Sequence, residues 1–174
     1  MRSTKYTPKH RALKQSALRQ WKRAAALGAT VPAAMSTAVT VSAPVQAAGQ
    51  EKVHEALEVA RNQKADEYEY GADGPDAFDC SGLIQYAYGK AGISMPRTSD
   101  DQADAVKRIA REDMRKGDLM FYTDSSGDVY HVGIFGGWDG DKHRYVLHAA
   151  NEGSDVLSEQ NWSGSWFAGT MRGQ

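Results

Sequence analysis

The sequence contains a single cysteine, Cys80, among its 174 residues. A lone thiol cannot form a disulfide within the chain, so packing alone has to hold the fold together. Long hydrophobic runs are also missing, because no stretch reaches the roughly 20 apolar residues with which a helix crosses a bilayer. Acidic residues are missing from one part of the chain, since residues 1–47 contain none. These absences exclude a disulfide scaffold and an integral membrane protein.

Residues 1–47 differ from the rest of the chain in composition. They carry eight basic residues before Ala24, followed by a stretch rich in Ala, Val, Thr, Met and Pro that ends in Val45-Gln46-Ala47-Ala48. A basic segment, an apolar stretch and small residues in this order are typical of an export signal, here cut after Ala47 or Ala48. A disordered basic tail or an organelle transit peptide is the alternative. We therefore expect residues 1–47 to be removed and residues 48–174 to be secreted as one domain.

Removal of residues 1–47 would change the charge of the protein. Of the 21 basic residues 13 remain, against 22 acidic ones, so the net charge becomes −9 instead of −1. A domain this acidic lacks the basic footprint that nucleic-acid binding requires. It should also adhere poorly to anionic polymers and lipids, and we expect no membrane insertion after the signal is removed. The 127 residues that remain suit one domain with a single core.

The hydrophobic pattern predicts helices first and strands afterwards. Apolar residues recur at helical spacing over residues 51–65 and 80–90, and Thr98 or Ser99 could cap a short helix that runs to Val106. Short apolar or alternating runs, separated by Gly, Asp and Ser, predict strands at residues 118–123, 131–135, 144–149 and 166–171. Helices followed by hairpin-linked strands favour an α+β domain, with the helices packed on one face of a central antiparallel sheet of about five strands.

Cys80 stands at the start of the second predicted helix, where Asp79 occupies the N-cap position. The free amides and the positive dipole end at a helix start favour a thiolate. His131 and His148 lie in neighbouring predicted strands, so they can serve as its base and as the partner that orients the base. One cysteine with distant histidines indicates a nucleophile that is assembled in space. We interpret His10, His54 and His143 as surface or structural residues.

A metal site is the chemical alternative for these side chains. Zinc can use one cysteine and two histidines, but no CxxC or HxxxH pair is present to form a rigid site around Cys80, His131 and His148. The Asp124-Ser126-Asp128 and Asp139-Asp141 clusters lack the length and the closing glutamate of a calcium-binding EF-hand loop. We interpret both clusters as solvated turns, and we expect neither a metal nor an organic cofactor.

Four segments together resemble a known family. These are YEYGADGPDAFDCSGLIQYAYGKAGISMPRTSDDQ, KGDLMFY, HVGIFGG and VLHAANEG. In this order they resemble the NlpC-type (NlpC/p-sixty) cell-wall cysteine endopeptidases, over roughly residues 52–172. The resemblance implies a papain-like fold and hydrolysis of peptidoglycan stem peptides, typically between D-glutamate and diaminopimelate or lysine. It also implies that Cys80 is the nucleophile, His131 the base and His148 the third, orienting residue.

The resemblance suggests further site residues. Tyr68 matches a family tyrosine whose hydroxyl lies near the thiol and can assist the oxyanion, although Tyr70 could be confused with it. Asp79 either caps the helix only or also contacts the substrate amine. Arg97 and Ser99 either line the substrate groove or structure their loop. Asp118, in the Gly-Asp-Leu segment, is expected to order a turn rather than to react.

The sequence therefore predicts a secreted, monomeric cysteine endopeptidase that acts on peptidoglycan stem peptides in the bacterial cell wall. Two alternatives stay open. One is a non-catalytic domain that binds the wall or regulates a partner while keeping the fold. The other keeps the thiol chemistry but transfers the acyl group differently, as an amidase or an acyltransferase would.

Overall fold

The computed structural model describes residues 45–173. The predicted export segment, residues 1–47, lies outside the described residues except for its last three, which belong to the first turn of α2. Among the described residues, the helices are too short or too polar to cross a membrane. The helices are α2 (Val45–Arg61), α3 (Cys80–Lys90), α4 (Ser99–Ala105) and the 3-10 turn η2 (Arg111–Asp113). The strands are β1 (Glu67–Tyr68), β2 (Ala77–Phe78), β3 (Lys107–Ile109), β4 (Leu119–Thr123), β5 (Val129–Trp138), β6 (Arg144–Ala149), β7 (Val156–Gln160) and β8 (Trp166–Thr170).

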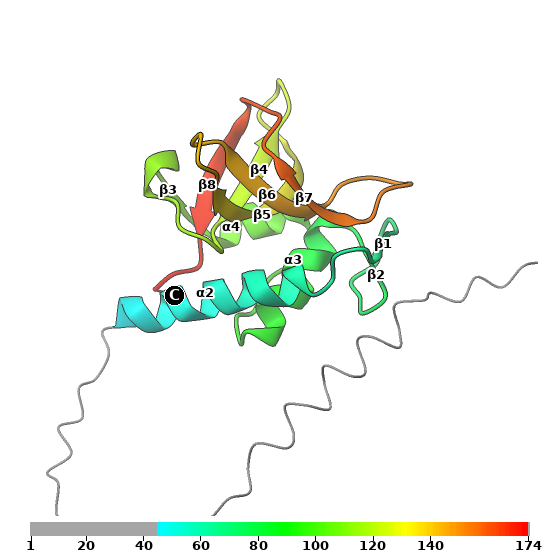
Figure 1. The fold of residues 1–174 in the computed structure, drawn as a ribbon, viewed down its shortest axis with the longest axis horizontal. Helices are drawn as coiled ribbons and strands as arrows, with labels where there is room; N and C mark the ends of the chain where they lie inside the picture. Colours follow the sequence, from blue (N-terminus) through cyan, green and yellow to red (C-terminus); the bar gives the residue numbers. More distant parts are fainter. Residues whose placement is uncertain (1–44, 174) are drawn as a thin grey trace, which may run out of the picture. The chain divides into compact units, whose positions relative to one another are not determined.

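The main sheet contains six strands in the order β3-β8-β4-β5-β6-β7, and every neighbouring pair is antiparallel. The helices α2 and α3 lie on one side of this sheet, as Figure 1 shows. A separate parallel pair of two-residue strands, β1 and β2, lies in the segment that leads into α3. The predicted α+β class, with N-terminal helices on an antiparallel sheet, is confirmed.

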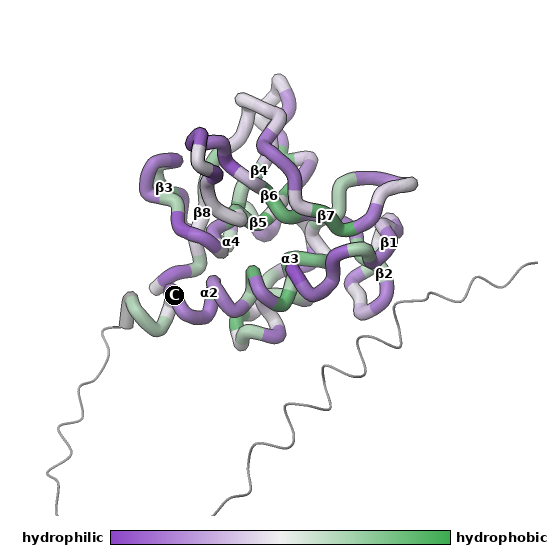
Figure 2. Tube along the Cα trace, viewed as in Figure 1, coloured by the Kyte–Doolittle hydropathy of each residue, from purple (hydrophilic) through white to green (hydrophobic). Residues whose placement is uncertain are grey.

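The core fills the space between the helices and the sheet. The residues of α2 that were predicted at helical spacing are all fully buried there, namely Val53, Ala56, Leu57 and Ala60. They pack with buried residues of α3 and with alternate residues of β4, β5 and β6. A second apolar cluster includes Met120, Tyr122, Phe135 and Val146 but no residue of α2, α3 or α4. Figure 2 shows hydrophobic residues gathered in α3 and the central strands, with hydrophilic residues along β3.

The element boundaries differ from the prediction at several points. The first helix begins at Val45 and ends at Arg61, whereas residues 51–65 were expected. Helix α3 has the predicted bounds, and α4 is capped by Thr98 rather than by Ser99. The four predicted strands correspond to β4, β5, β6 and β8. Strands β3 and β7 were not predicted from the sequence, and both lie at the edges of the sheet.

Candidate active site

Cys80 is the first residue of α3, and a rigid cap holds the backbone there. Asp79 is extended, and its Oδ1 accepts a hydrogen bond of 2.7 Å from the amide of Gly82. Arg97 donates to both carboxylate oxygens of Asp79, at 3.0 and 2.6 Å. Gly82 is required by close packing, since a Cβ atom there would lie 2.1 Å from the carbonyl oxygen of Ala72. The Asp-Cys-Ser-Gly segment therefore fixes where the thiol-bearing residue lies.

The thiol of Cys80 is mostly shielded from water, and this burial determines its protonation state. Burial raises its pKa above the ordinary value, and the neighbouring Asp79 carboxylate adds to this effect. Backbone amides of Val132, Ser81 and Cys80 itself point to the sulfur and lower the pKa, but they do not outweigh burial. The amides at the helix start thus act in the expected direction, toward the thiolate, but burial outweighs them in the free protein. The resting form is the protonated thiol, because desolvation exceeds the effect of the helix start.

The two histidines come from adjacent strands and contact each other directly. His131 lies near the start of β5 and His148 near the end of β6, so both are at the same end of an antiparallel pair. The distance between His131 Nε2 and His148 Nδ1 is 2.8 Å. Gly133 permits this approach, because a Cβ atom there would lie 2.3 Å from Val146 Cγ2 and 3.2 Å from His148 Cβ. The structure thus places the two imidazoles in one hydrogen-bonded line.

His148 also contacts two residues that sequence reasoning missed. Its Nε2 lies 3.1 Å from Oε1 of Glu159, in strand β7. The indole of Trp162 stacks on the His148 ring, with centroids 5.0 Å apart, and stacks on Tyr122 at 4.7 Å. The signal that could have identified Glu159 is the run Val156–Gln160, which pairs with β6 but alternates too weakly to be recognised as a strand.

Burial keeps both histidines uncharged. It lowers the pKa of His131 from 6.5 to about 3, with a smaller contribution from the neighbouring His148. Burial also lowers the pKa of His148, although the Glu159 carboxylate acts in the opposite direction. At neutral pH the site therefore contains a neutral thiol and neutral imidazoles. A proton can move from sulfur to nitrogen without either group being charged beforehand.

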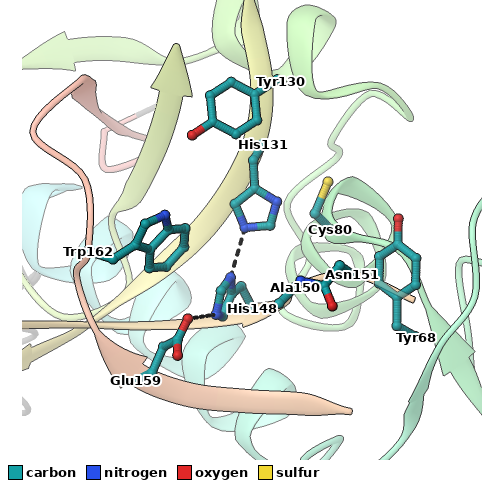
Figure 3. Close-up of a pocket in the computed structure, with 9 residues that line it drawn as sticks. All are labelled: Tyr68, Cys80, Tyr130, His131, His148, Ala150, Asn151, Glu159 and Trp162. Atoms are coloured by element: carbon teal, nitrogen blue, oxygen red, sulfur yellow. Dashed lines mark hydrogen bonds and ion pairs between the residues drawn. The ribbon is translucent and has the colours of Figure 1, made fainter. Parts of the chain in front are cut away.

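These side chains surround one cavity of about 470 Å³, which Figure 3 shows in close-up. Its lining consists of Tyr68, Cys80, Tyr130, His131, His148, Ala150, Asn151, Glu159 and Trp162. In Figure 3 the Cys80 sulfur lies beside the His131 ring, and the Tyr68 ring lies on the other side of Cys80. Burial and the nearby Cys80 raise the pKa of Tyr68, so its hydroxyl keeps a proton that it can donate. Tyr70, in contrast, is 82% exposed and does not line the cavity.

The remaining predicted site residues lie outside this cavity lining. Asp79 and Arg97 form the ion pair that supports the start of α3, and Arg97 also donates to the carbonyl of Ala72. Burial opposes ionisation of Asp79, but the hydrogen bonds from Arg97 and Gly82 hold its pKa below the usual value. Ser99 is the first residue of α4. The structure therefore gives Asp79 and Arg97 a role in ordering the loop, and their contact with substrate stays a prediction.

Metal-binding geometry occurs elsewhere in the described residues. The one group of His, Cys, Asp or Glu side chains there that is compact enough to hold an ion is Asp139, Asp141 and His143. Asp139 Oδ1 accepts hydrogen bonds from the amides of Asp141 and His143, at 2.9 and 2.8 Å. These bonds are those of a side chain that orders its own turn. Asp124 orders the other predicted turn in the same way, through the amides of Ser126 and Asp128.

Comparison with known proteins identifies the family. Residues 65–171 match the model of the NlpC/P60 family. The chain belongs to this family. The match includes every residue of the NlpC/P60 site described above, from Tyr68 to Trp162, and it confirms the resemblance seen in the sequence.

Three relatives of this NlpC/P60 chain are informative. A probable endopeptidase of Corynebacterium glutamicum is 40% identical over 121 residues, which are 69% of this chain and 51% of that protein. A gamma-D-glutamyl-L-lysine dipeptidyl-peptidase of Bacillus subtilis is 36% identical over 91 residues, 51% of this chain and 29% of that protein. The crystal structure of the NlpC/p60 domain of the peptidoglycan hydrolase SagA has a TM-score of 0.60 at 29% identity, covering 68% of this chain and 98% of that one. The chain thus spans about half the length of the Corynebacterium relative.

Proposed function

We propose that this protein is a secreted cysteine endopeptidase that hydrolyses the stem peptides of bacterial peptidoglycan. The observation that carries the proposal is the convergence of Cys80, His131 and His148 on one cavity in an NlpC/P60 chain. The scissile bond that we propose joins D-glutamate to a diamino acid, by analogy with the Bacillus relative. The pattern of residues 1–47 supports export to the cell wall.

The geometry supports a sequence of proton transfers that begins from the neutral pair. His131 takes the proton from the Cys80 thiol while the sulfur attacks the carbonyl carbon of the stem peptide. The oxyanion that develops can be bound by the backbone amide of Cys80 at the start of α3 and by the hydroxyl of Tyr68. The protonated His131 then donates its proton to the leaving amine. Cleavage of the C–N bond releases the amine and leaves a thioester on Cys80. In the second half, His131 accepts a proton from the water that attacks the thioester carbon, the C–S bond breaks to release the acid, and His131 returns the proton to the sulfur.

Digestion of a defined muropeptide by the purified full chain tests the proposal. We expect mass spectrometry to detect the two fragments that cleavage at the D-glutamyl bond produces. Cys80→Ala and His131→Ala should each lower the cleavage rate by roughly 1,000-fold or more. EDTA should leave the rate unchanged. His54→Ala is the control, because His54 is exposed on α2. Hydrolysis by Cys80→Ala at the wild-type rate would exclude this mechanism, and a strong loss on chelation would favour a metal site.

The same assay separates the alternatives. Binding to purified wall without any fragment would favour a non-catalytic domain, while cleavage at the lactyl amide or a product with a new acyl acceptor would favour an amidase or an acyltransferase. Sequencing the N-terminus of the exported protein checks the proposed cleavage after Ala47 or Ala48.

A further inference from the structure

The hydrogen-bonded line of the site does not end at His148 but at Glu159. His148 is almost completely buried, whereas the side chain of Glu159 is 47% exposed. The line of hydrogen bonds thus runs from His131, which lies beside Cys80, through His148 to a carboxylate in the edge strand β7, as Figure 3 shows. Glu159 therefore joins the buried pair to the surface.

The chemistry of a carboxylate fixes the direction of every hydrogen bond in this line. An ionised carboxylate can only accept, so Nε2 of His148 has to carry the proton and donate it to Glu159. In a neutral His148 the other nitrogen, Nδ1, is then bare and has to accept from His131 Nε2. A neutral His131 that donates from Nε2 has a bare Nδ1. Figure 3 shows this second ring nitrogen on the side of Cys80.

We propose that Glu159 is a positioning residue that, acting through His148, holds His131 in the tautomer whose bare Nδ1 faces the Cys80 thiol. The inference rests on the proposed function, since it concerns the base of that reaction. The opposite tautomer would present an N–H to the sulfur and could not accept its proton. The site needs a residue that selects the tautomer, because a neutral imidazole can carry its proton on either nitrogen and both rings are uncharged.

The surroundings of His148 leave Glu159 as the acceptor for its outer nitrogen. Trp162 stacks on the ring of His148, and Tyr122 stacks in turn on Trp162. Asn161, the residue before Trp162, accepts a hydrogen bond of 3.0 Å from the hydroxyl of Tyr122, which anchors this loop. Because Glu159 lies at the surface, water can partly replace it when it is removed. The expected loss is therefore well below the roughly 10,000-fold that accompanies a fully wrong tautomer.

The test compares three variants of the full chain. Glu159→Leu removes the acceptor, whereas Glu159→Gln keeps an oxygen that can accept from His148. Glu152→Gln is the matched control, since it removes a carboxylate near Tyr68 that does not line the cavity. We expect Glu159→Leu to lower kcat by about 10- to 100-fold with KM changed less than about threefold. Glu159→Gln should recover most of this loss, and Glu152→Gln should match the wild type.

Nitrogen-15 NMR of the labelled histidines reads the tautomers directly and without substrate, with His131→Ala and His148→Ala as assignment variants. The wild type should carry protons on Nε2 of both His131 and His148, and Glu159→Leu should shift His131 toward the Nδ1–H form. An unchanged His131 tautomer in folded Glu159→Leu would overturn the proposal, as would equal loss of kcat in the Gln and Leu variants. If the wild type cleaves no muropeptide, the proposed function fails, whereas the tautomer comparison still decides the role of Glu159.

Discussion

Cys80 and His131 are both held in their uncharged forms by burial. The pKa of the thiol is raised and that of the imidazole is lowered, although the thiol lies beside an imidazole that could accept its proton. An ion pair that existed before substrate arrived would have to be maintained in a poorly solvated site. We infer that the charge separation develops during attack on the substrate carbonyl, where the amide of Cys80 and the hydroxyl of Tyr68 can stabilise the oxyanion.

The lowered pKa of His131 predicts that the protein loses stability in acid. An unfolded histidine titrates near 6.5, whereas His131 in the folded chain titrates near 3. Between these values the unfolded chain binds a proton that the folded chain does not bind, so the contribution of neutral His131 is complete above pH 6.5 and is lost as the pH falls through about 3. We expect the free energy of unfolding to fall by a few kcal/mol between about pH 7 and about pH 4 from this group alone.

Urea denaturation at these two pH values checks this prediction. His131→Asn should lose less stability on acidification than the wild type, because asparagine does not titrate. His54→Asn, at an exposed position on α2, should lose as much as the wild type. Equal losses in His131→Asn and the wild type would show that buried His131 does not contribute.

At the scale of the elements, the start of α3 decides where the nucleophile lies, and two glycines of this helix make a matched pair. A Cβ atom at Gly82 would lie 2.1 Å from the carbonyl oxygen of Ala72 and 3.0 Å from Asp79 Oδ1. A Cβ atom at Gly89 would meet nothing within 4 Å. The same substitution in one helix should therefore have opposite effects.

We expect Gly82→Ala to destabilise the protein by roughly 2 kcal/mol or more, because the backbone of the cap must move. It should also lower kcat, since Cys80 moves with the cap. Gly89→Ala should raise the free energy of unfolding by about 0.5–1 kcal/mol, because alanine has a higher helix propensity than glycine at an exposed helix position. It should leave kcat unchanged. Thermal melting and muropeptide cleavage measure both effects. A Gly82→Ala protein as stable and active as Gly89→Ala would show that this contact does not hold the helix start.

The elements that carry the proposed triad could be predicted from the sequence, whereas those that surround it could not. Strong periodicity marks α3 and the central strands, and the Asp79 cap marks the position of Cys80. Strand β7 is the last strand of the sheet, and its residues from Leu157 to Gln160 are partly or fully exposed and include polar side chains, which hide the strand pattern. Glu159 was therefore missed together with its strand. Trp162 belongs to a loop, and its stacking on His148 depends on tertiary packing that no local pattern reports.

At the scale of the whole molecule, one buried ion pair joins the end of the chain to the centre of the sheet. Asp118 precedes β4 and is completely buried, and Arg172 contacts both of its carboxylate oxygens at 2.9 and 2.8 Å. Thr170 and the amide of Arg115 also donate to this carboxylate. Tyr88 of α3 donates to the carbonyl of Gly117 next to it. As predicted from the sequence, Asp118 orders a turn, and the turn connects helix, sheet and C-terminal segment.

Removal of Arg172 should therefore destabilise the whole domain. Arg172→Ala leaves the Asp118 carboxylate buried without its cation, which costs about 3–5 kcal/mol when one partner of a buried pair is lost. Glu58→Gln is the control, because Glu58 pairs with Arg61 at the surface and such pairs contribute less than about 1 kcal/mol. Adding Asp118→Asn to Arg172→Ala should restore part of the loss, since an amide has no charge to desolvate. Urea denaturation that found Arg172→Ala no less stable than Glu58→Gln would mean that this ion pair does not hold the end of the chain to the sheet.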